Sequence, residues 1–376
     1  MSAAKASILL AGGGSGGHIA PGLAIAERLR ECAPDVGVVF ACSTRAVDSQ
    51  MLEPTGFDYQ AIPAEHLSKS PLELMRFVKA FADGRSASKE LMRERHVRGV
   101  VALGGFVTGP VVSAAQSLGV PVMLLNLDAT PGKANRWVAK RAVTVLSACP
   151  TPSEPNFARA VVGMPVRRAA IATLKRDECR ARLGLEPGLH TLLVTGASQG
   201  AKSLNDLVAL MLLRERAAFG GWQVLHLVGS ADRKPIEDAY REAGVHAKVL
   251  PFLHEMGLAW GAADAALSRA GANSVAEAVI NCVPTVFAPY PFHADRHQRH
   301  NAAPFVQEGL ALMEDDLVDA EKNLRTLGAA LRSLMTETPR RTSMRAALES
   351  KERLDAANAL AHTLLRMAKL EGKIAV

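Results

Sequence analysis

The residue types that suggest chemistry most directly are those of residues 268–277 (SRAGANSVAE), a glycine turn followed by an acid. It follows an apolar segment, residues 262–267, and opens a short predicted helix. Gly271 and Ala272 allow a bulky ligand to approach the backbone, and the N–H groups of a helix start favour phosphate. Glu277 follows within the same helix, where its carboxylate can accept hydrogen bonds from ribose hydroxyls. The stretch predicts half of a nucleotide site.

The same residues also fit a purely structural interpretation. Ser274 and Glu277 have the spacing of a capping box, in which both side chains only satisfy N–H groups at a helix end. The sequence that follows favours a ligand site, because residues 289–301 (PYPFHADRHQRHN) gather polar side chains just after a predicted strand, residues 285–288. Ligands of open α/β sheets bind outside the carboxyl ends of the strands.

A second glycine turn, residues 12–17, lies between a predicted strand, residues 7–11, and a predicted helix. Its glycines match the spacing of dinucleotide-binding turns, a pattern that is weak evidence alone. His18 stands at the start of the helix, where the dipole lowers the pKa of an imidazole and attracts anions. We expect His18 to be functional, with satisfaction of the helix end as the alternative.

The end of the next predicted strand, residues 36–42, bears on the cofactor. Ser43, Thr44 and Arg45 follow it, and none of them is an acid placed for the ribose of NAD. This counts against an NAD enzyme. Arg45 leaves an NADP enzyme as an alternative.

Predicted strands and helices alternate in two successive arrays. The strands are expected at residues 7–11, 36–42, 99–103, 120–125 and 142–146, and then at residues 192–195, 223–228, 248–251 and 285–288. Each array opens with a glycine turn. Such alternation implies parallel sheets, so the expected fold class is α/β, with two Rossmann-like domains facing a cleft.

The two arrays set the expected domain limits. We expect an N-terminal domain at residues 1–163, a linker at residues 164–168, a second domain at residues 169–345 and a C-terminal helical segment at residues 346–376. Residues 161–168 are expected to begin as a strand that enters the linker.

Composition narrows the choice of partners. A chain of 376 residues allows two domains, and its net charge of +7 favours an anionic partner. Aromatic residues make up 5% of the chain and do not alternate with basic ones, which argues against nucleic acid. The five cysteines are dispersed, as in a protein with reduced thiols. Since no apolar run approaches about 20 residues, we expect a soluble protein or one bound to a membrane surface.

Residues 71–81 (PLELMRFVKAF) combine apolar side chains with Arg76 and Lys79, and further basic residues follow. Such a helix suits the surface of an anionic membrane. An amphipathic helix packed on its own sheet is an equally good interpretation.

Six motifs in one order then point to a family. They are GGSGGH at 13–18, GGFVTGP at 104–110, GMPVR at 163–167, GASQGA at 196–201, SRAGANSVAE at 268–277 and DRHQ at 295–298. Together they resemble MurG, the family of peptidoglycan N-acetylglucosaminyltransferases, over residues 7–305.

The resemblance implies a GT-B fold and an activity. The reaction would be an inverting transfer of GlcNAc from UDP-GlcNAc to the C4 hydroxyl of MurNAc in lipid I, giving lipid II. The N-terminal domain would take the acceptor and meet the membrane, and the second domain would bind UDP-GlcNAc. The resemblance also implies no cofactor and no obligatory metal.

The resemblance assigns roles position by position. Ser15, Gly16 and Gly17 would lie near the donor sugar and the acceptor pyrophosphate, and His18 becomes the leading catalytic candidate. Arg167 would meet the donor diphosphate, and Ser198 would close on it. The remaining expected contacts are Leu253 with uracil, Ala272, Asn273, Ser274 and Val275 with phosphate, Glu277 with ribose, and Gln298 with GlcNAc. Leu74, Phe77, Val78 and Phe81 match the family's membrane-contacting patch.

This chain departs from the family at residues 125–128, where LNLD replaces the usual HEQN. Asn126 takes the place of an acid, and Asp128 takes the place of an asparagine expected to touch the donor sugar. Asp128 is therefore a second catalytic candidate, with His18 acting alone as the alternative. Ser15 keeps the hydroxyl of the more common threonine, and His297, in place of a glutamine, can still bond the sugar.

Two other functions stay open on the sequence. One is a related GT-B transferase with a different lipid or small-molecule acceptor, supported by residues 125–128. The other is a nucleotide-binding module without transfer activity, which the presence of His18 and Gln298 opposes. Under the favoured interpretation the protein is peripheral on the cytoplasmic face of the cell membrane. Its partners are then UDP-GlcNAc, lipid I, an anionic membrane and other cell-wall synthesis proteins, and nucleic acid is not among them. The protein would then act in cell shape and cell division.

Overall fold

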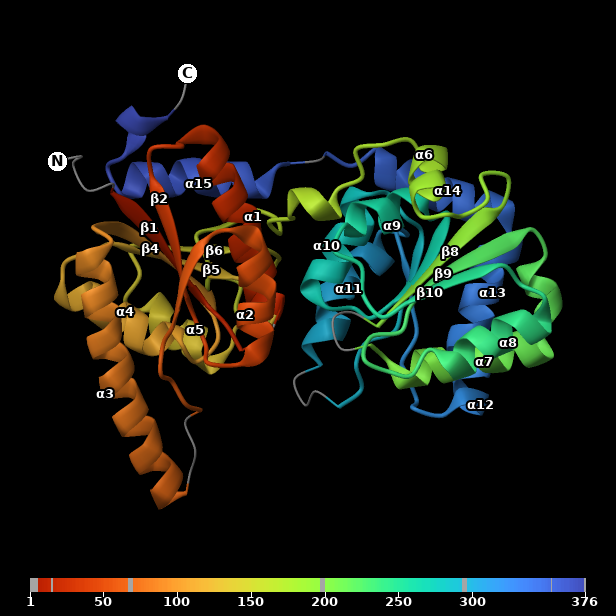
Figure 1. Cartoon of the computed structure of the whole chain (residues 1–376), viewed down its shortest axis with the longest axis horizontal. Coiled ribbons are helices and arrows are strands. Elements are labelled where there is room, and N and C mark those ends of the chain that lie inside the picture. The colour runs from red at the N-terminus through yellow and green to blue at the C-terminus, as the bar shows by residue number, and fades with distance from the viewer. Residues whose placement is uncertain are drawn as a thin grey trace. The chain divides into compact units, whose positions relative to one another are not determined.

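The computed structural model describes residues 6–14, 16–66, 70–196, 200–292, 296–352 and 354–374. The chain divides into two compact units (Figure 1). Unit 1 comprises Met1–Arg167 and Leu354–Val376, and unit 2 comprises Arg168–Arg353.

Unit 1 is built on a parallel sheet of seven strands in the order β3-β2-β1-β4-β5-β6-β7. The strands are β1 (Ser7–Gly12), β2 (Gly37–Cys42), β3 (Asp58–Ala61), β4 (Val97–Gly104), β5 (Val122–Asn126), β6 (Thr144–Ser147) and β7 (Ala160–Val161). The helices are α1 (Gly16–Cys32), α2 (Ala46–Leu52), α3 (Pro71–Glu94), α4 (Thr108–Ser117), α5 (Lys133–Ala139) and α15 (Ala356–Met367).

The apolar runs of the central strands explain this layering. In β1, Ile8 and Leu10 belong to the core shared with α1 and α15, whereas Leu9 and Ala11 belong to the core shared with α3 and α4. Successive side chains of a strand point to opposite faces, so a strand that is apolar throughout must be covered on both sides.

Unit 2 repeats the plan with six parallel strands in the order β10-β9-β8-β11-β12-β13. The strands are β8 (His190–Thr195), β9 (Trp222–Leu227), β10 (Ala247–Leu250), β11 (Ala265–Ser268), β12 (Thr285–Phe287) and β13 (Leu312–Met313). The helices are α6 (Arg176–Arg182), α7 (Lys202–Arg214), α8 (Lys234–Ala243), α9 (Met256–Ala262), α10 (Ala272–Ile280), α11 (His297–Gln307), α12 (Ala320–Asn323), α13 (Ala329–Thr336) and α14 (Thr338–Glu349).

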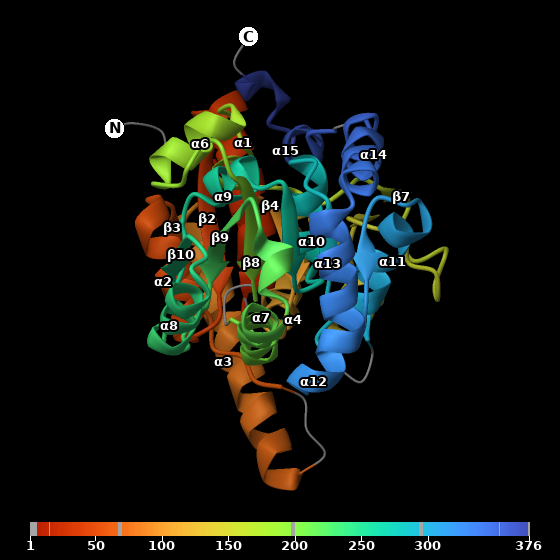
Figure 2. The same ribbon diagram turned by 90° about the vertical axis from the view of Figure 1, so that its right-hand side faces the viewer.

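The C-terminal residues correct one predicted domain limit. Residues 346–376 do not form a separate segment, because α14 ends in unit 2 and α15 returns to unit 1. Helix α15 lies against α1, as Figures 1 and 2 both show. Its buried residues Leu360, Leu364 and Leu365 join the core of unit 1, which gives the return its driving force.

The return is also held by a buried charge. Arg28, in α1, is 1% exposed and donates from Nε to Asp355 Oδ2 at 2.9 Å, just before α15 begins. Its Nη2 also donates to the carbonyl of Val166 at 3.5 Å. The end of unit 1 and the returning helix thus share one arginine.

The nine strands predicted from the sequence are confirmed, with ends that shift by at most two residues. Three edge strands were missed, namely β3, β7 and β13, which have two to four residues and none that is fully buried. The central strand β11 was expected only as an apolar segment, residues 262–267. The strand expected to begin at residue 161 is wrong, since β7 ends at Val161. Gly163 has a φ of 84° and Pro165 lacks an N–H group, so neither suits a continuing strand.

Both sheets change direction in the same way. In unit 1 the strand order runs outward from β1 on one side and from β4 on the other, and in unit 2 it does so from β8 and β11. Such a switch point leaves a crevice at the carboxyl ends of the two central strands, where ligands bind. The glycine turns at residues 12–17 and 104–110, and the turn at residues 268–271, directly follow these strands.

Candidate active site

Two glycine turns meet at the switch point of unit 1. Gly105 has a φ of 81°, and a Cβ atom added to it would lie 2.5 Å from the carbonyl oxygen of Gly13. Gly104 has a φ of 111°, and an added Cβ would lie 3.0 Å from Nε2 of His18. Both positions therefore need glycine, because a side chain would push the two turns apart.

His18 lies in the first turn of α1, together with Gly16 and Gly17. Its Nδ1 is 3.1 Å from the carbonyl oxygen of Gly13. A carbonyl only accepts hydrogen bonds, so Nδ1 carries the proton and Nε2 keeps a lone pair. The imidazole is thus oriented as a base through Nε2.

Burial of the imidazole lowers the pKa of His18 below its ordinary value. The negative charge of Asp128, the bond to Gly13 and the charge of Asp48 act in the opposite direction but do not outweigh burial. His18 is therefore neutral at neutral pH, which is the form that can accept a proton.

Asp48 holds the glycine turn in place and was missed in the sequence. This residue, in the first turn of α2, is 0% exposed. Its Oδ2 accepts hydrogen bonds from the N–H of Gly14 at 2.8 Å and from the hydroxyl of Ser43 at 2.6 Å. The signal in the sequence was an acid just after the second predicted strand, at a position from which a carboxylate can reach the glycine turn at residues 12–17.

Arg45 also serves the glycine turn. Its Nη1 donates to the carbonyl of Gly14 at 2.9 Å, and its guanidinium carbon lies 5.4 Å from the centre of the Phe106 ring. The guanidinium that the NADP alternative would place on a cofactor phosphate is thus directed at the protein's own backbone.

Asn126, at the position where the resemblance predicted an acid, forms the centre of a buried amide network. Its Nδ2 donates to the carbonyl of Asp128 at 2.6 Å and to Oγ of Ser147 at 3.0 Å. Its Oδ1 accepts a hydrogen bond from Nδ2 of Asn135 at 3.0 Å. A carboxylate could not donate the first two bonds, so Asn126 acts as a structural amide and shapes the turn that carries Asp128.

Asp128 is partly exposed and lies near His18. Its negative charge raises the pKa of His18. It also acts on Cys149, whose pKa is raised to about 12, first by burial and then by Asp128. The structure therefore brings the two catalytic candidates of the sequence together in unit 1.

Arg167 ends unit 1 and is partly exposed. Its Nε lies 3.5 Å from Oε1 of Glu27 in α1. Glu27 keeps this guanidinium beside the helix whose first turn carries His18.

The turn at residues 268–271 delivers the start of α10 at the switch point of unit 2. The helix begins at Ala272, with Gly271 as its N-cap residue, and no side chain caps it. Its first internal hydrogen bond runs from the N–H of Val275 to the carbonyl of Gly271 at 3.0 Å. The N–H groups of Ala272, Asn273 and Ser274 precede that bond, as a phosphate-binding helix start requires.

The capping-box interpretation of Ser274 and Glu277 is wrong. Ser274 lies inside the helix, and Glu277 instead accepts a hydrogen bond at Oε2 from Nε1 of Trp260 at 2.9 Å. Trp260, in α9, is 1% exposed and was not singled out in the sequence. The indole fixes the direction of the Glu277 carboxylate. Only the folded chain reveals this partner, since the two residues are 17 positions apart.

Leu253 lies in the loop before α9 and is partly buried against the core of unit 2. Its neighbour Phe252 is 53% exposed, and its ring lies edge-on to that of His254 at 4.9 Å between centres. The loop expected to meet uracil thus leads directly into the helix that carries Trp260.

Gln298 lies in the first turn of α11, next to His297. Its Oε1 accepts a hydrogen bond from the N–H of Tyr290 at 2.9 Å. The amide group of Gln298 is thereby oriented with its NH₂ pointing away from Tyr290. Ser15, Ser198 and Asp295 lie outside the described residues.

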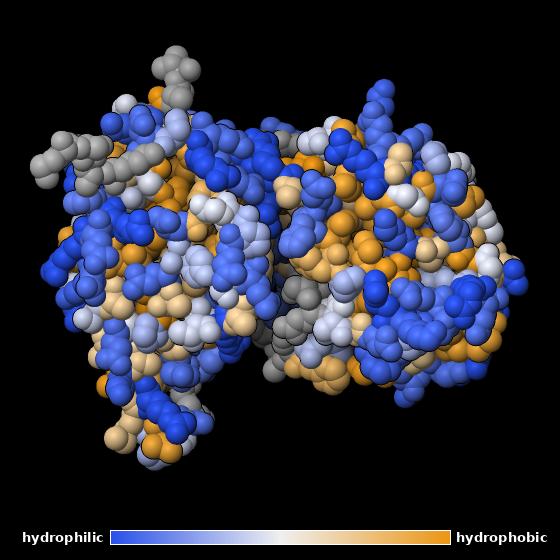
Figure 3. Space-filling view, viewed as in Figure 1, coloured by the Kyte–Doolittle hydropathy of each residue, from blue (hydrophilic) through white to orange (hydrophobic). Residues whose placement is uncertain are grey.

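Helix α3 has two distinct halves. Gly84, Ser88, Leu91 and Met92, in the second half, are buried, as the packed-helix interpretation requires. In the first half Leu74 is 44% and Val78 59% exposed. This half extends away from the sheet in Figure 1 and carries apolar surface in Figure 3.

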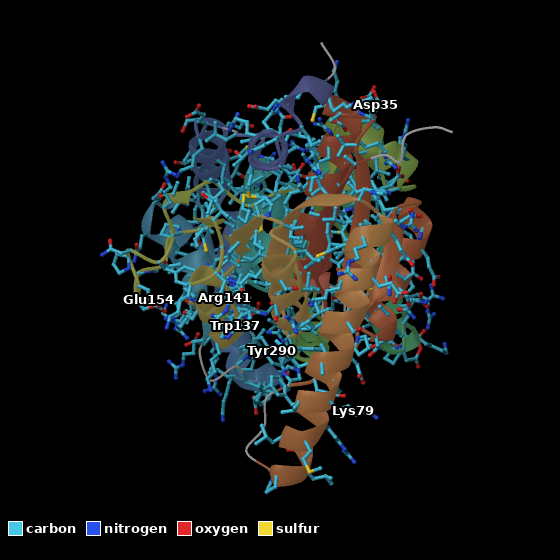
Figure 4. The ribbon with its side chains drawn as sticks, turned by 90° about the vertical axis from the view of Figure 1, so that its left-hand side faces the viewer. Asp35, Lys79, Trp137, Arg141, Glu154 and Tyr290 are labelled. Carbon is cyan, nitrogen blue, oxygen red and sulfur yellow. The ribbon has the colours of Figure 1, made fainter. Side chains whose placement is uncertain are left out.

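Phe77 and Phe81 are only partly exposed. Their ring centres are 6.0 Å apart, and Phe81 lies edge-on to Trp137 of α5 at 6.5 Å. The guanidinium of Arg141 lies over the Trp137 ring at 3.8 Å (Figure 4). These aromatic rings connect the exposed half of α3 to the body of unit 1.

No helix among the described residues is long and apolar enough to cross a membrane. The same residues contain no group of three or more His, Cys, Asp or Glu residues that could hold a metal ion.

Comparison with known proteins places this geometry in a class. The chain resembles the crystal structure of MurG from Acinetobacter baumannii, with a TM-score of 0.72, 23% identity and coverage of 96% of this chain and 99% of that one. It also resembles a UDP-glucosyltransferase from Polygonum tinctorium, with a TM-score of 0.69, 15% identity and coverage of 98% and 100%. The two parallel-sheet units are those of a GT-B glycosyltransferase.

Sequence matches define the family. The N-terminal domain model of glycosyltransferase family 28 matches residues 8–147, and the C-terminal domain model matches residues 191–360. A UDP-N-acetylglucosamine–N-acetylmuramyl-(pentapeptide) pyrophosphoryl-undecaprenol N-acetylglucosamine transferase from Desulforudis audaxviator is 33% identical over 97% of this chain and 99% of its own length. A protein of the same name from Streptomyces avermitilis is 36% identical over 82% of this chain and 85% of its own length. The chain therefore belongs to glycosyltransferase family 28, in its MurG branch, as the motifs predicted.

Proposed function

We propose that this chain transfers GlcNAc from UDP-GlcNAc to the C4 hydroxyl of MurNAc in lipid I, giving lipid II for peptidoglycan synthesis. The observation that carries the proposal is the match to relatives named for this transfer, which spans both units and 97% of the chain. Roles in cell shape and cell division follow from the same proposal.

Transfer of labelled GlcNAc from UDP-GlcNAc to a lipid I analogue, with EDTA present, tests the function. Labelled lipid product at a rate unchanged by EDTA supports it. Binding of UDP-GlcNAc without transfer to lipid I, but with transfer to another lipid or small molecule, would replace it by a related GT-B activity.

Unit 2 is the proposed donor site. The start of α10 would receive the diphosphate at the N–H groups of residues 272–274, and Glu277 would bind the ribose. Val275, which the sequence also assigned to phosphate, would only support that turn, because its side chain is buried and its N–H donates to the carbonyl of Gly271 at 3.0 Å. Leu253 would pack on uracil, while Gln298 and His297 would bind GlcNAc hydroxyls, and Ser198 would close on the diphosphate.

Unit 1 is the proposed acceptor site, with Ser15, Gly16 and Gly17 near the pyrophosphate. Nε2 of His18 would take the proton of the C4 hydroxyl as its oxygen bonds to C1 of GlcNAc. The bond from C1 to the phosphate oxygen breaks, and UDP leaves with the electron pair. Attack from the opposite side inverts the configuration at C1.

We propose that Asp128 stabilises the imidazolium that forms on His18. Asp128→Asn should lower kcat by about 10-fold or more, because the compensating charge is lost. Asp35→Asn makes the same change at an exposed position of unit 1 and should leave kcat as it is (Figure 4). Adding Asn126→Glu to Asp128→Asn should not restore activity, since a glutamate at 126 cannot donate to Ser147. Full activity of the double variant would contradict this division of roles.

We further propose that the transfer needs neither a cofactor nor a metal. Arg167 and the start of α10 carry the positive charge that a departing diphosphate requires. Loss of turnover in EDTA and its recovery with Mg²⁺ would contradict this.

The exposed half of α3 is the proposed membrane contact, on the cytoplasmic face of the cell membrane. Leu74 and Val78 would enter the interface, with Arg76 and Lys79 near anionic head groups. Phe77 and Phe81 would contribute less, because they are partly covered. The protein would bind lipid I, and contact other proteins of cell-wall synthesis, at this surface.

Sedimentation with vesicles tests this surface. Leu74→Glu with Val78→Glu should reduce binding to anionic vesicles. Leu213→Glu changes an equally apolar residue of unit 2 that is 79% exposed and should not reduce it. Equal binding by all three proteins would exclude α3 as the contact.

A further inference from the structure

Unit 2 contains a buried ion pair that the donor contacts do not use. Nη1 of Arg269 lies 2.8 Å from Oδ2 of Asp316, and their side chains are 7% and 0% exposed. Arg269 directly follows β11, and Asp316 lies in the loop between β13 and α12. The pair therefore joins two loops at the carboxyl ends of the sheet.

Two further segments are attached to the same guanidinium. Nη2 of Arg269 donates to Oγ of Ser203 at 3.0 Å, in the first turn of α7, and Nη1 donates to the carbonyl of Ala288 at 3.1 Å, after β12. The Ser203 hydroxyl donates to Oδ2 of Asp316 at 2.5 Å. One arginine thus connects the segments that follow β8, β11, β12 and β13.

The other oxygen of Asp316 is also occupied. Its Oδ1 accepts from Nδ2 of Asn323 at 2.7 Å and from the N–H of Val318 at 2.8 Å. Burial raises the pKa of Asp316, but the bonds from Ser203, Asn323 and Val318 and the charge of Arg269 outweigh it and lower that pKa. Asp316 is therefore ionised at neutral pH, and both of its oxygens are satisfied.

The loop held by Asp316 is strained. Val318 has a φ of 57°, a left-handed conformation that is costly for a β-branched residue. Such a residue persists only where its surroundings fix it. Here Asp316 and Asn323 do so, with Asn323 also accepting from the N–H of Leu317 at 2.8 Å.

The network leads to the proposed sugar contact. The guanidinium carbon of Arg269 lies 5.7 Å from the centre of the Tyr290 ring. The N–H of Tyr290 donates to Oε1 of Gln298 at 2.9 Å. Arg269 also lies two residues before Gly271, the N-cap of the helix proposed to bind the diphosphate.

We propose that Arg269 and Asp316 are positioning residues, which hold the start of α10 and the loop carrying Tyr290 and Gln298 in the geometry that binds UDP-GlcNAc. A buried ion pair is a poor source of stability, since replacing both partners by apolar residues is often neutral. Here the pair instead fixes the arrangement of the four segments that follow β8, β11, β12 and β13. The inference rests on the proposed donor role of unit 2.

Removal of the whole pair separates positioning from stability. In Arg269→Met with Asp316→Leu no buried charge is left unpaired, so we expect a folded protein, with a melting temperature that falls because Asn323 and Val318 lose their acceptor. Its Kd and KM for UDP-GlcNAc should rise about 10-fold or more, because several hydrogen bonds that orient the loops are lost. The KM for the lipid I analogue should stay the same.

A second variant and a matched control complete the test. Ser203→Ala removes one partly exposed hydroxyl, should fold in any case, and should raise the Kd for UDP-GlcNAc about 3-fold or more. Arg214→Met with Glu321→Leu removes an exposed ion pair between α7 and α12, the helices that carry Ser203 and Asn323, at the far end of α7. Helices α7 and α12 lie side by side in Figures 1 and 2. This control should bind UDP-GlcNAc as the wild type does.

Calorimetric titration of UDP-GlcNAc into the wild type, Ser203→Ala and the two double variants decides between the outcomes. Failure of the wild type to bind UDP-GlcNAc would overturn the proposed function itself. Binding by the wild type, with unchanged Kd in Ser203→Ala and in every folded double variant, would overturn the positioning role alone. Weaker donor binding in Ser203→Ala and in the Arg269 and Asp316 variant, but not in the Arg214 and Glu321 variant, is the result expected.

Discussion

Replacement of Trp260 by phenylalanine should weaken the binding of UDP-GlcNAc without unfolding unit 2. The indole N–H donates to Oε2 of Glu277 at 2.9 Å and is the contact that directs this carboxylate. Phenylalanine keeps an aromatic ring in the core but cannot donate. Glu277 then keeps its charge and loses this hydrogen bond.

The size of the effect follows from this contact. Hydrogen bonds to charged groups contribute about 1.5–3 kcal/mol, and the carboxylate recovers part of this from water. We expect a loss of about 1–2 kcal/mol in donor binding, which corresponds to a Kd about 5- to 30-fold higher. The smaller ring leaves unfilled space at a site that is 1% exposed, which should lower the free energy of unfolding by about 1–3 kcal/mol.

Isothermal titration with UDP-GlcNAc and with UDP, well below the melting temperature, measures this effect. Trp222→Phe is the matched control, because Trp222, at the start of β9, is also buried in unit 2 but its ring lies tilted against that of His190 in β8. It should cost stability and leave the Kd unchanged. Equal Kd values for the two phenylalanine variants would refute the role given to Trp260 and Glu277.

Four further outcomes are expected. His18→Ala should abolish transfer with UDP-GlcNAc affinity little changed, and the acidic limb of kcat/KM in the wild type should lie below pH 6.5, because the pKa of His18 is lowered. Glu277→Ala should weaken donor binding by about 1–3 kcal/mol, whereas a loss of melting temperature alone would limit Glu277 to a structural role beside Trp260. Burial lowers the pKa of His226 from 6.5 to about 3, so the stability that its neutral form contributes is present above pH 6.5 and is lost as the pH falls towards 3. Between pH 7 and pH 5, the free energy of unfolding in urea should therefore fall by about 2 kcal/mol more in the wild type than in His226→Gln. Val318→Asn should raise the free energy of unfolding by about 1 kcal/mol by relieving its positive φ, and Val143→Asn, at another exposed valine, should not.

Local chemistry explains what the sequence predicted. A strand that is apolar throughout, followed by glycines and then a helix pattern, has few structural alternatives, and this is why the turns at residues 12–17 and 268–271 were located correctly. The same reasoning placed His18 and residues 272–275 at helix starts. Edge strands such as β13 were missed because two residues leave no periodic signal.

Contacts between distant residues account for what was not predicted. Three contacts depend on packing between separate elements. They are the hydrogen bond of Trp260 to Glu277, that of Gly14 to Asp48, and the packing of α15 against α1. Asn126 shows a different limit of sequence reasoning. The sequence showed that an asparagine stands where an acid was expected, but it did not show that this side chain donates to Ser147 and Asp128. Arg269 lay within a recognised motif, and only the folded chain shows its partner Asp316.

The most direct test of the central claim is the structure of the product formed from UDP-GlcNAc and a lipid I analogue. Nuclear magnetic resonance of that product reports both the hydroxyl that is substituted and the configuration at C1 of GlcNAc. Transfer to C4 of MurNAc with inversion at C1 is the result we predict. A product with retained configuration, a product substituted at another hydroxyl, or no product from a wild type that binds UDP-GlcNAc would contradict the claim.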